Sequence, residues 1–290
     1  MMSSPLTKSR VLIEALPYLK AFDRKTVVIK IGGSTMTDKK ILPSVVRDVV
    51  FLEQVGVWPI LVHGGGPRIT EEMERLGLKA NFVKGRRVTD EATLGIAQKV
   101  LIDEISVNVV ELIQKAEGQA IPLNGRGSRF LRCEKKVFEE DPGMDLGYVG
   151  EITSIDAELA QRISSGGVIP VVAPIATGKD GHLYNVNADS VAWKIAAETK
   201  AEKLVYLSNV PGILRDKDKP ESLISNATIP ECDQMIKDGI IVGGMIPKIE
   251  ACVAALRHGV KKTHVISGLL QHSLLLEIFT PEGIGTEIRL

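Results

Sequence analysis

Hydrophobic and polar positions along the chain predict strands that alternate with helices. Short apolar runs typical of strands occupy residues 26–31, 58–62, 167–172, 203–207, 260–266 and 287–290. Apolar residues at helical spacing occupy residues 43–55, 69–76, 90–116, 189–199, 229–238 and 247–258. Because strands and helices alternate, we expect an α/β fold with a mainly parallel sheet covered by helices on both faces.

Two regions depart from this alternation. Residues 6–22 carry an apolar stripe at helical spacing, interrupted by Pro17, ahead of the first strand. Such a helix either covers the core or reaches another subunit, and the pattern does not decide between the two. Residues 122–150 are glycine-rich and are expected to form short strands and hairpins. No linker in the sequence suggests independently folded domains.

Composition and charge exclude several classes of protein. Basic and acidic residues number 36 each, so the formal net charge is zero and nothing global favours nucleic acid or a membrane as partner. No apolar run reaches the roughly 18 residues of a membrane span. The three cysteines form no C-x-x-C pair, which argues against a disulfide framework or a structural zinc site. We therefore expect a cytoplasmic protein.

Three glycine-rich turns are candidate anion sites, at residues 30–34, 63–67 and 243–248. Bare glycine backbone lets N–H groups approach an anion, and a helix N-terminus attracts negative charge. Lys30 opens the first turn and Lys248 closes the third. Taken alone, the first turn is more typical of a strand end with a solvated lysine, whereas the other two favour anion binding.

Polar side chains near these turns could contact a substrate. Arg87 has the planar fork that binds carboxylates, although exposed arginines are common. Asn185 and Asn187 share one face of an extended segment. Asp189 either caps the next helix or pairs with a lysine, and the cap is the simpler interpretation. His63 alone is more typical of a hydrogen-bonded loop residue than of a base.

The pattern of motifs favours phosphoryl transfer. The sequence contains no G-x-x-x-x-G-K-[ST], G-x-S-x-G, H-E-x-x-H or G-x-G-x-x-G. Lysines beside bare glycine turns, without an evident general base, suit a reaction that needs mainly positioning and charge neutralisation.

Nine motifs in order resemble those of the acetylglutamate kinases, in the amino-acid kinase superfamily. They are V-V-I-K-I-G-G, L-V-H-G-G-G-P, G-R-R-V-T-D, L-G-Y-V-G-E-I, I-P-V-V-A-P-I, Y-N-V-N-A-D, N-V-P-G-I-L, G-G-M-I-P-K and L-L-L-E-I-F-T-P-E-G-I-G-T. The resemblance implies a three-layer αβα sandwich around a mainly parallel sheet of about eight strands. It also implies a helical extension at 1–24 and a kinase domain at 25–290. Within that domain, a lobe at about 25–170 would bind N-acetyl-L-glutamate and form the dimer contact, and a lobe at about 171–290 would bind the nucleotide.

The resemblance assigns roles to individual residues. Lys30 and Lys248 would stabilise the transferring phosphoryl group, and Asp189 would orient both lysines. Substrate contacts would come from Gly65, Gly66, Arg87, Asn185 and Asn187. Nucleotide contacts would come from Gly32, Gly33, Ser208, Asn209, Gly212, Ile213, Leu214, Gly244 and Met245. The implied cofactors are ATP and Mg²⁺, with no metal ligand from protein side chains.

Regulation is implied by the two ends of the chain. The N-terminal helix and residues 277–286 resemble the arginine-regulated branch, in which such helices join dimers into a hexamer, a trimer of dimers. Glu277, Glu282 and Gly285 are then candidate contacts for L-arginine as a feedback inhibitor. A nitrogen-signalling protein is a further candidate partner.

Some positions depart from the family pattern. Asn209 stands where aspartate is usual, Ser267-Gly268-Leu269 replaces D-G-R, and residues 124–128 replace S-G-K-D-G. These changes bear on nucleotide binding more than on chemistry. They leave three alternatives open: a catalytically weak or dead arginine or nitrogen sensor, another carboxylate kinase such as glutamate 5-kinase, and a plain nucleotide-binding module.

Overall fold

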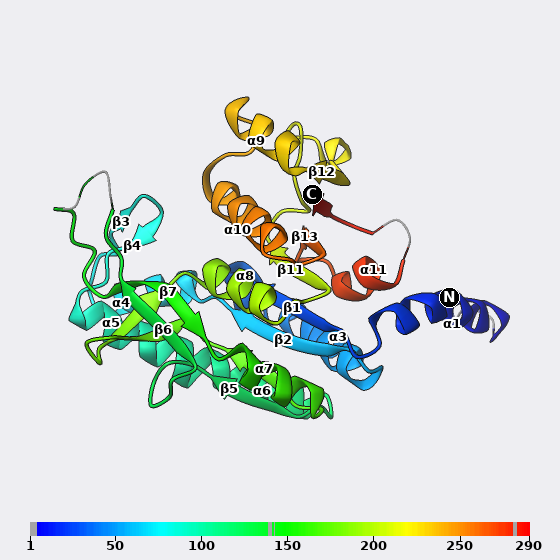
Figure 1. The fold of residues 1–290 in the computed structure, drawn as a ribbon, viewed down its shortest axis with the longest axis horizontal. Coiled ribbons are helices and arrows are strands. Elements are labelled where there is room, and N and C mark those ends of the chain that lie inside the picture. Colours follow the sequence, from blue (N-terminus) through cyan, green and yellow to red (C-terminus); the bar gives the residue numbers. More distant parts are fainter. Residues whose placement is uncertain (1–4, 139–140, 142, 281–282) are drawn as a thin grey trace.

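One eight-stranded sheet forms the centre of the molecule (Figure 1). The computed structural model describes residues 5–138, 141, 143–280 and 283–290. In spatial order the strands are β12 (Asn226–Thr228), β14 (Thr286–Arg289), β13 (Lys262–Ser267), β11 (Lys203–Ser208), β1 (Thr26–Ile31), β2 (Trp58–His63), β8 (Ile169–Val172) and β5 (Ala120–Leu123). All neighbours in this sheet are parallel except β13 and β14. The mainly parallel sheet predicted from the sequence is confirmed.

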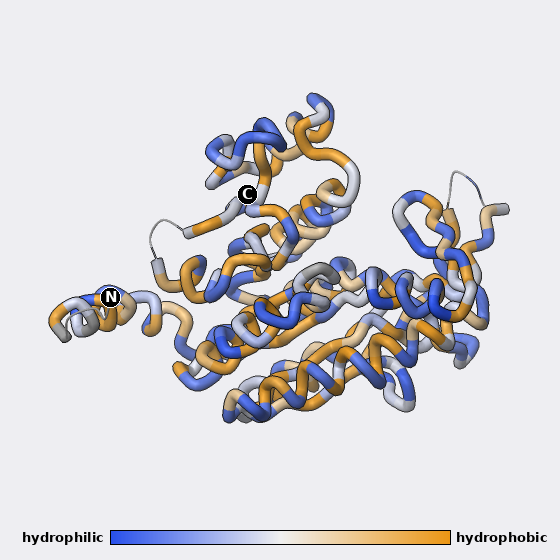
Figure 2. Tube along the Cα trace, turned by 180° about the vertical axis from the view of Figure 1, so that it is seen from behind, coloured by the Kyte–Doolittle hydropathy of each residue, from blue (hydrophilic) through white to orange (hydrophobic). Residues whose placement is uncertain are grey.

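Helices cover both faces of the sheet. On one face lie α7 (Ala157–Ser165), α8 (Ala188–Glu198) and α10 (Ile246–Arg257), and on the other α3 (Ile41–Gln54), α6 (Val107–Lys115) and α11 (Ser273–Phe279). Side chains of β1 alternate between the two cores, with Val28 in the first and Val27 and Ile29 in the second. Hydrophobic and hydrophilic stretches alternate along the covering helices (Figure 2). The chain is thus the three-layer αβα sandwich that was expected.

The register of the central strands brings the glycine turns together. Ile31, the last residue of β1, pairs with His63 on β2 and with Leu207 on β11. Since all three strands run parallel, the turns that follow them lie at one edge of the sheet. Ligands bind at this carboxyl edge in open α/β sheets.

Smaller elements stand over the same edge. A closed barrel is formed by β6 (Leu131–Lys135), β7 (Val149–Ile155), β9 (Ile175–Gly178) and β10 (Leu183–Val186). A hairpin of β3 (Phe82–Val83) and β4 (Arg86–Arg87) lies nearby (Figure 1). The short strands predicted within 122–150 are present, whereas β9 and β10 were missed because their four residues give little alternation.

The helices differ from the sequence-based prediction in two respects. Three were missed: α2 (Gly33–Thr37), α7 and α11. The single helix predicted at 90–116 comprises α5 (Glu91–Gln98), a π-helical segment η1 (Lys99–Ser106) and α6. A π segment keeps the apolar face nearly continuous, so hydrophobic spacing does not reveal it. The remaining helices are α4 (Gly66–Arg75), α9 (Ile229–Lys237) and two short 3-10 turns, η2 (Pro220–Ser222) and η3 (Gly243–Met245).

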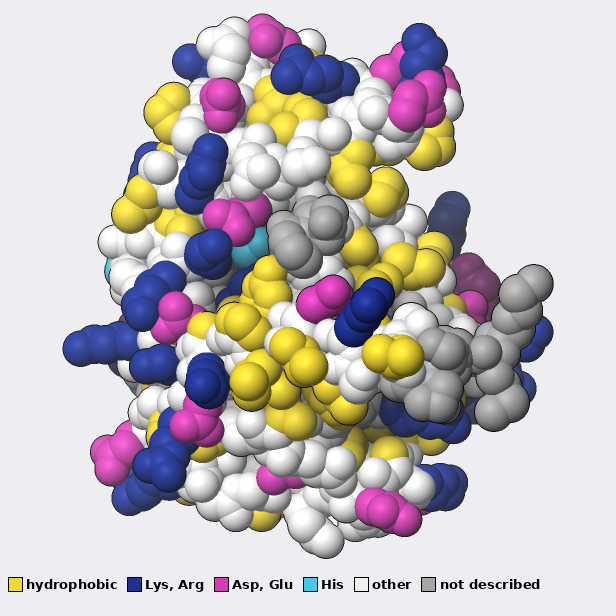
Figure 3. All heavy atoms as spheres, turned by 90° about the vertical axis from the view of Figure 1, so that its right-hand side faces the viewer, with side chains coloured by type: hydrophobic (Ala, Val, Ile, Leu, Met, Phe, Trp, Pro, Cys, Tyr) yellow, Lys and Arg dark blue, Asp and Glu magenta, His cyan; other side chains and the backbone are white. Residues whose placement is uncertain are grey.

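The N-terminal helix α1 (Pro5–Phe22) projects from the body of the molecule (Figure 1). Its apolar residues Leu12 and Ile13 are each 69% exposed, so this helix does not cover the core. Pro17 lies inside the helix without ending it. Apolar side chains gather on the face from which α1 projects (Figure 3). Within the described residues, no helix combines the length and hydrophobicity needed to cross a bilayer.

Candidate active site

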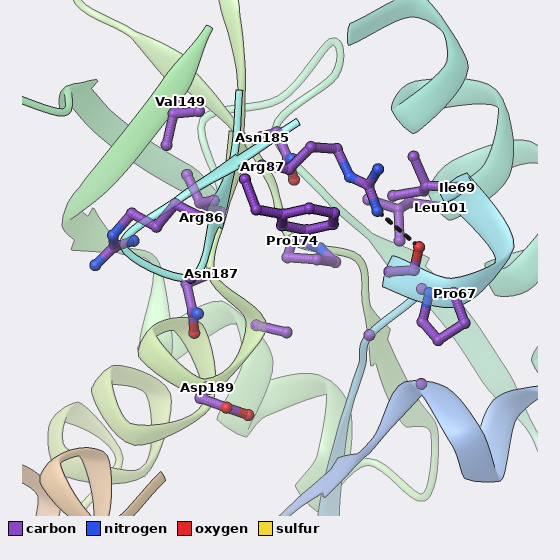
Figure 4. A pocket seen from close by; sticks show the side chains of 18 of the residues that line it. Pro67, Ile69, Arg86, Arg87, Leu101, Val149, Pro174, Asn185, Asn187 and Asp189 are labelled. Atoms are coloured by element: carbon purple, nitrogen blue, oxygen red, sulfur yellow. Dashed lines mark hydrogen bonds between the residues drawn. The ribbon is translucent and has the colours of Figure 1, made fainter. Parts of the chain in front are cut away.

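A cavity of about 300 Å³ lies at the carboxyl edge of the sheet (Figure 4). It is bounded by the ends of β1 and β2, the start of α4, the β3–β4 hairpin and the segment from β10 into α8. Its lining includes the predicted residues Lys30, Gly33, Gly65, Gly66, Arg87, Asn185, Asn187 and Asp189. The structure therefore brings together side chains and turns separated by up to 160 positions in sequence.

Two lysines meet one carboxylate at the floor of this cavity. Lys30 Nζ lies 2.7 Å from Asp189 Oδ1, and Lys248 Nζ lies 3.0 Å from Asp189 Oδ2. Lys30 leaves β1, Asp189 lies in the first turn of α8, and Lys248 in the first turn of α10. Each carboxylate oxygen thus holds one ammonium group, and the two ammonium groups flank Asp189.

Burial sets the charge balance of this triad. Lys30 is 6% exposed, and burial lowers the pKa of its ammonium group although Asp189 opposes the shift. Burial would raise the pKa of Asp189, but Lys30 and Lys248 outweigh it and hold that pKa below its usual value. Asp189 is therefore a carboxylate at neutral pH, and its charge keeps Lys30 protonated.

Asn187, and not Asp189, caps helix α8. The Asn187 side-chain oxygen accepts a hydrogen bond from the Ser190 N–H at 3.0 Å. The interpretation of Asp189 as the cap is thus wrong. The capping pattern alone could not separate two polar residues two positions apart, each able to accept from the first turn.

The second glycine turn opens a helix whose first N–H groups have no side-chain cap. Helix α4 begins at Gly66, with Gly65 as its N-cap residue. A Cβ on Gly65 would lie 2.5 Å from Leu101 Cδ2, and one on Gly33 would lie 2.5 Å from Pro67 Cδ. Close packing therefore requires bare backbone here, and the uncapped N–H groups remain available to an anion.

Arg87 reaches the same turn from the β3–β4 hairpin. Its Nη2 donates to the Gly66 carbonyl at 2.8 Å and to Thr70 Oγ1 at 2.7 Å (Figure 4). The guanidinium carbon lies 4.7 Å from the centre of the Phe82 ring. Across the cavity, the Asn185 amide donates to Thr89 Oγ1 at 3.4 Å. Arg87 and Asn185 thus offer a cation and an amide from opposite walls.

The predicted nucleotide residues lie mainly outside this cavity. Ser208 ends β11, Gly32 follows β1, and Gly244 lies in η3 before α10. A Cβ on Gly32 would lie 2.8 Å from the Leu207 carbonyl oxygen, so strand packing requires this glycine. Other members of the set are Asn209, Gly212, Ile213, Leu214 and Met245, none of which lines the cavity.

Two of these residues have structural roles of their own. Gly212 has φ +155°, and a Cβ there would lie 2.5 Å from Thr286 Oγ1. Ile213 is 2% exposed and packs in the core. Only the backbone of Ile213 could therefore meet a ligand.

A second cavity, of about 490 Å³, lies between the end of α1, helix α11 and strand β14. It contains two predicted effector residues, Glu277 and Gly285, while Glu282 lies outside the described residues. Glu277 Oε1 lies 3.4 Å from Lys203 Nζ and 2.9 Å from His264 Nε2. Burial would raise the pKa of Glu277, but these partners lower it to about 2. A Cβ on Gly285 would lie 2.3 Å from the Val265 carbonyl oxygen, which accounts for that glycine by packing alone.

Sequence reasoning missed several residues of the two cavities. Lys203 starts a fully buried strand, and a charge in such a strand is a signal that could have been used. Leu101 and Phe82 line the first cavity with apolar surface, for which the sequence holds no signal. In the part of the chain that the structure describes, no three His, Cys, Asp or Glu side chains gather where a metal ion could bind.

Comparison with known proteins agrees with this geometry. A sequence model of the amino acid kinase family matches residues 25–267. The acetylglutamate kinase of Thermoanaerobacter pseudethanolicus is 49% identical over 283 residues, covering 98% of this chain and 93% of that protein. The acetylglutamate kinase of Heliobacterium modesticaldum is 44% identical over 293 residues, covering 99% of both.

A solved structure extends the comparison to the fold. N-acetylglutamate synthase from Neisseria gonorrhoeae, complexed with coenzyme A and L-arginine, superposes with a TM-score of 0.84 at 26% identity. The alignment covers 99% of this chain but only 66% of the synthase. The chain belongs to the amino acid kinase family and, within it, to the acetylglutamate kinases.

Proposed function

We propose that this chain transfers the γ-phosphoryl group of ATP to the side-chain carboxylate of N-acetyl-L-glutamate. The observation that carries the proposal is the pair of ammonium groups, from Lys30 and Lys248, held on one buried carboxylate at the floor of the cavity. The family and its full-length relatives give the reaction class and the substrate.

The reaction requires charge neutralisation rather than proton transfer. A carboxylate oxygen of the substrate attacks the γ-phosphorus, the bond from that phosphorus to the bridging oxygen breaks, and ADP leaves with the bond's electron pair. The nucleophile is already ionised at neutral pH, so no general base is needed. Two lysines flanking the transferring group would neutralise its oxygens, and one such contact contributes about 3–4 kcal/mol to the transition state.

The walls of the cavity suit an acylated amino acid. The N–H groups at the start of α4 can bind the reacting carboxylate. Arg87 supplies a guanidinium for the second carboxylate, and Asn185 supplies an amide for the acetamido group. These assignments rest on the chemistry of the groups that line the cavity.

The nucleotide is assigned to the adjacent edge of the sheet. Turns after β1 and β11 and the start of α10 meet there, and Lys248 extends from α10 toward Asp189. Mg²⁺ would accompany the ATP phosphates, because the carboxylate at the floor has both oxygens paired with lysines. In that position the ion would supply further positive charge to the phosphates.

We assign the second cavity to L-arginine as a feedback inhibitor. Glu277 and Glu287 offer carboxylates to a guanidinium, and Lys203 offers a cation to an α-carboxylate. The synthase with the similar fold is complexed with L-arginine. The exposed apolar face of α1 fits the role of joining dimers into a hexamer, a trimer of dimers. All three cysteines are buried and free, which fits a reaction in the cytoplasm.

One experiment separates this proposal from the alternatives. The pure protein is incubated with MgATP and, in turn, acetylglutamate, glutamate, aspartate and carbamate, while ADP release is measured. Release with acetylglutamate alone supports the proposal, and release with glutamate alone would replace it with a glutamate kinase. No release with any acid would favour the arginine-sensing regulator.

A further inference from the structure

The π-helical segment η1 contacts the second glycine turn through a buried hydrogen bond. His63 and Ser106 are both 0% exposed, and His63 Nε2 lies 2.8 Å from Ser106 Oγ. His63 is the last residue of β2 and is followed directly by the glycines at 64–66, and Ser106 is the last residue of η1. The contact therefore joins the start of the turn to an element 43 positions away.

The hydrogen positions in this contact follow from the acceptors around it. Burial lowers the pKa of His63 to about 4, so the ring is neutral and carries one hydrogen. His63 Nδ1 lies 3.1 Å from the Gly64 carbonyl oxygen, which can only accept. The hydrogen is therefore on Nδ1, and Nε2 accepts from the Ser106 hydroxyl. Because that hydroxyl has one hydrogen, its second neighbour, the Leu101 carbonyl at 3.0 Å, competes for it.

The same segment also packs on the middle and the far side of the turn. Leu101 and Ile105 of η1 occupy the space beside Gly65, 2.5 and 2.8 Å from where its Cβ would be. Lys99 Nζ pairs with the buried Glu72 of α4 at 2.9 Å, and Glu104 pairs with Arg68 of α4 at 3.0 Å. Segment η1 thus contacts the turn before, within and after its glycines, although only Leu101 lines the cavity.

We infer that Ser106 is a positioning residue for the reaction: through His63 it fixes the conformation in which the glycine turn presents its N–H groups to the ligand. The inference rests on the proposed function of that turn. Three adjacent glycines leave the backbone free to take up many conformations, so an outside contact has to select one. A regular α-helix would shift Ser106 relative to Leu101, whereas the wider π turn lets the residue at one end reach His63 while Leu101 and Ile105 reach Gly65.

The test compares two buried serines that contact the same strand at opposite ends. Ser106→Ala removes the hydroxyl that contacts His63, while Ser164→Ala removes one that donates to the Pro59 carbonyl at 2.9 Å. We expect Ser106→Ala to lower kcat with acetylglutamate roughly tenfold without changing KM for ATP, since small misplacements at a reacting centre cost this much or more. Ser164→Ala should stay near wild-type kcat, and both variants should lose similar amounts of melting temperature. Equal kcat in the two variants would overturn the inference.

A second pair of variants decides the case should Ser106→Ala fold poorly. His63→Gln places an amide near the position of Nε2 and keeps the contact to Ser106, whereas His63→Asn places it near Nδ1 and keeps only the contact to Gly64. We expect the Gln variant to be the more active. An equally or more active Asn variant would contradict a role for Ser106.

A readout independent of catalysis keeps the two proposals distinguishable. Hydrogen exchange of peptides covering residues 62–69 should be faster in Ser106→Ala than in Ser164→Ala. Faster exchange together with a wild-type protein that does not turn over acetylglutamate would sink the proposed function and leave the positioning role standing. Equal exchange in the two variants would sink the positioning role.

Discussion

Replacing Asp189 with asparagine should uncouple the two lysines while leaving the shape of the site intact. Asn is isosteric with Asp but carries no charge, so Lys30 and Lys248 lose their shared partner at 2.7 and 3.0 Å. At an effective dielectric of about 20, each contact corresponds to roughly 5–6 kcal/mol of Coulomb attraction before desolvation is counted. Removing one partner of a buried pair costs about 3–5 kcal/mol, and deprotonation of Lys30 would relieve part of that loss.

The sign of the pH effect follows from the causes of the Lys30 shift. Burial lowers the pKa of Lys30 and Asp189 raises it, so the pKa of Lys30 falls further in Asp189→Asn. Fewer molecules then carry the ammonium group at pH 7–8. We expect kcat to drop about 100-fold or more and the alkaline limb of its pH profile to move at least one unit lower, roughly the effect of losing one transition-state contact.

A matched variant controls for the chemistry of the substitution. Asp156→Asn makes the same change at the N-cap of α7, where the side chain accepts from the Leu159 N–H and asparagine caps equally well. Its kcat and pH profile should match the wild type. If Asp189→Asn also keeps the wild-type kcat and alkaline limb, the electrostatic reasoning is refuted.

Three further outcomes are expected. Lys248→Ala should lower kcat by about 10²–10³ with a melting temperature near wild type, because this lysine is partly exposed; retained turnover would remove it from the mechanism. Glu277→Gln should lower the free energy of unfolding at pH 7 by about 3 kcal/mol, since the pKa of Glu277 falls from 4.5 to about 2 on folding. That contribution is present above pH 4.5 and lost as pH falls through 2, so the two proteins should converge there in denaturant titrations; a pH-independent difference would contradict it. Deleting residues 1–22 should reduce the mass in solution and weaken arginine inhibition with kcat unchanged, and unchanged mass and inhibition would refute the role of α1.

The sheet and its glycine turns were predictable because their signals are local. A run such as Thr26–Ile31 is buried on both faces and so is apolar throughout, and the turn that follows it lacks side chains. Parallel order then places successive turns at one edge. The family motifs added the order of the strands and the pairing of Lys30 with Lys248, which spacing alone could not supply.

The remaining features depend on contacts between distant segments. The π segment at 99–106 reads as ordinary helix, because its apolar face continues through α5 and α6. Whether Asn187 or Asp189 caps α8 was decided by lysines from two other elements. The second cavity combines α1, β11, α11 and β14, and only the fold shows that Lys203 meets Glu277.

The most direct test of the central claim is a crystal structure with acetylglutamate and a non-hydrolysable ATP analogue. We predict that Lys30 Nζ and Lys248 Nζ both lie about 3 Å from oxygens of the γ-phosphoryl group, on opposite sides of it, with Asp189 between them. A ligand-bound structure in which either ammonium group points away from the phosphoryl group would contradict the account.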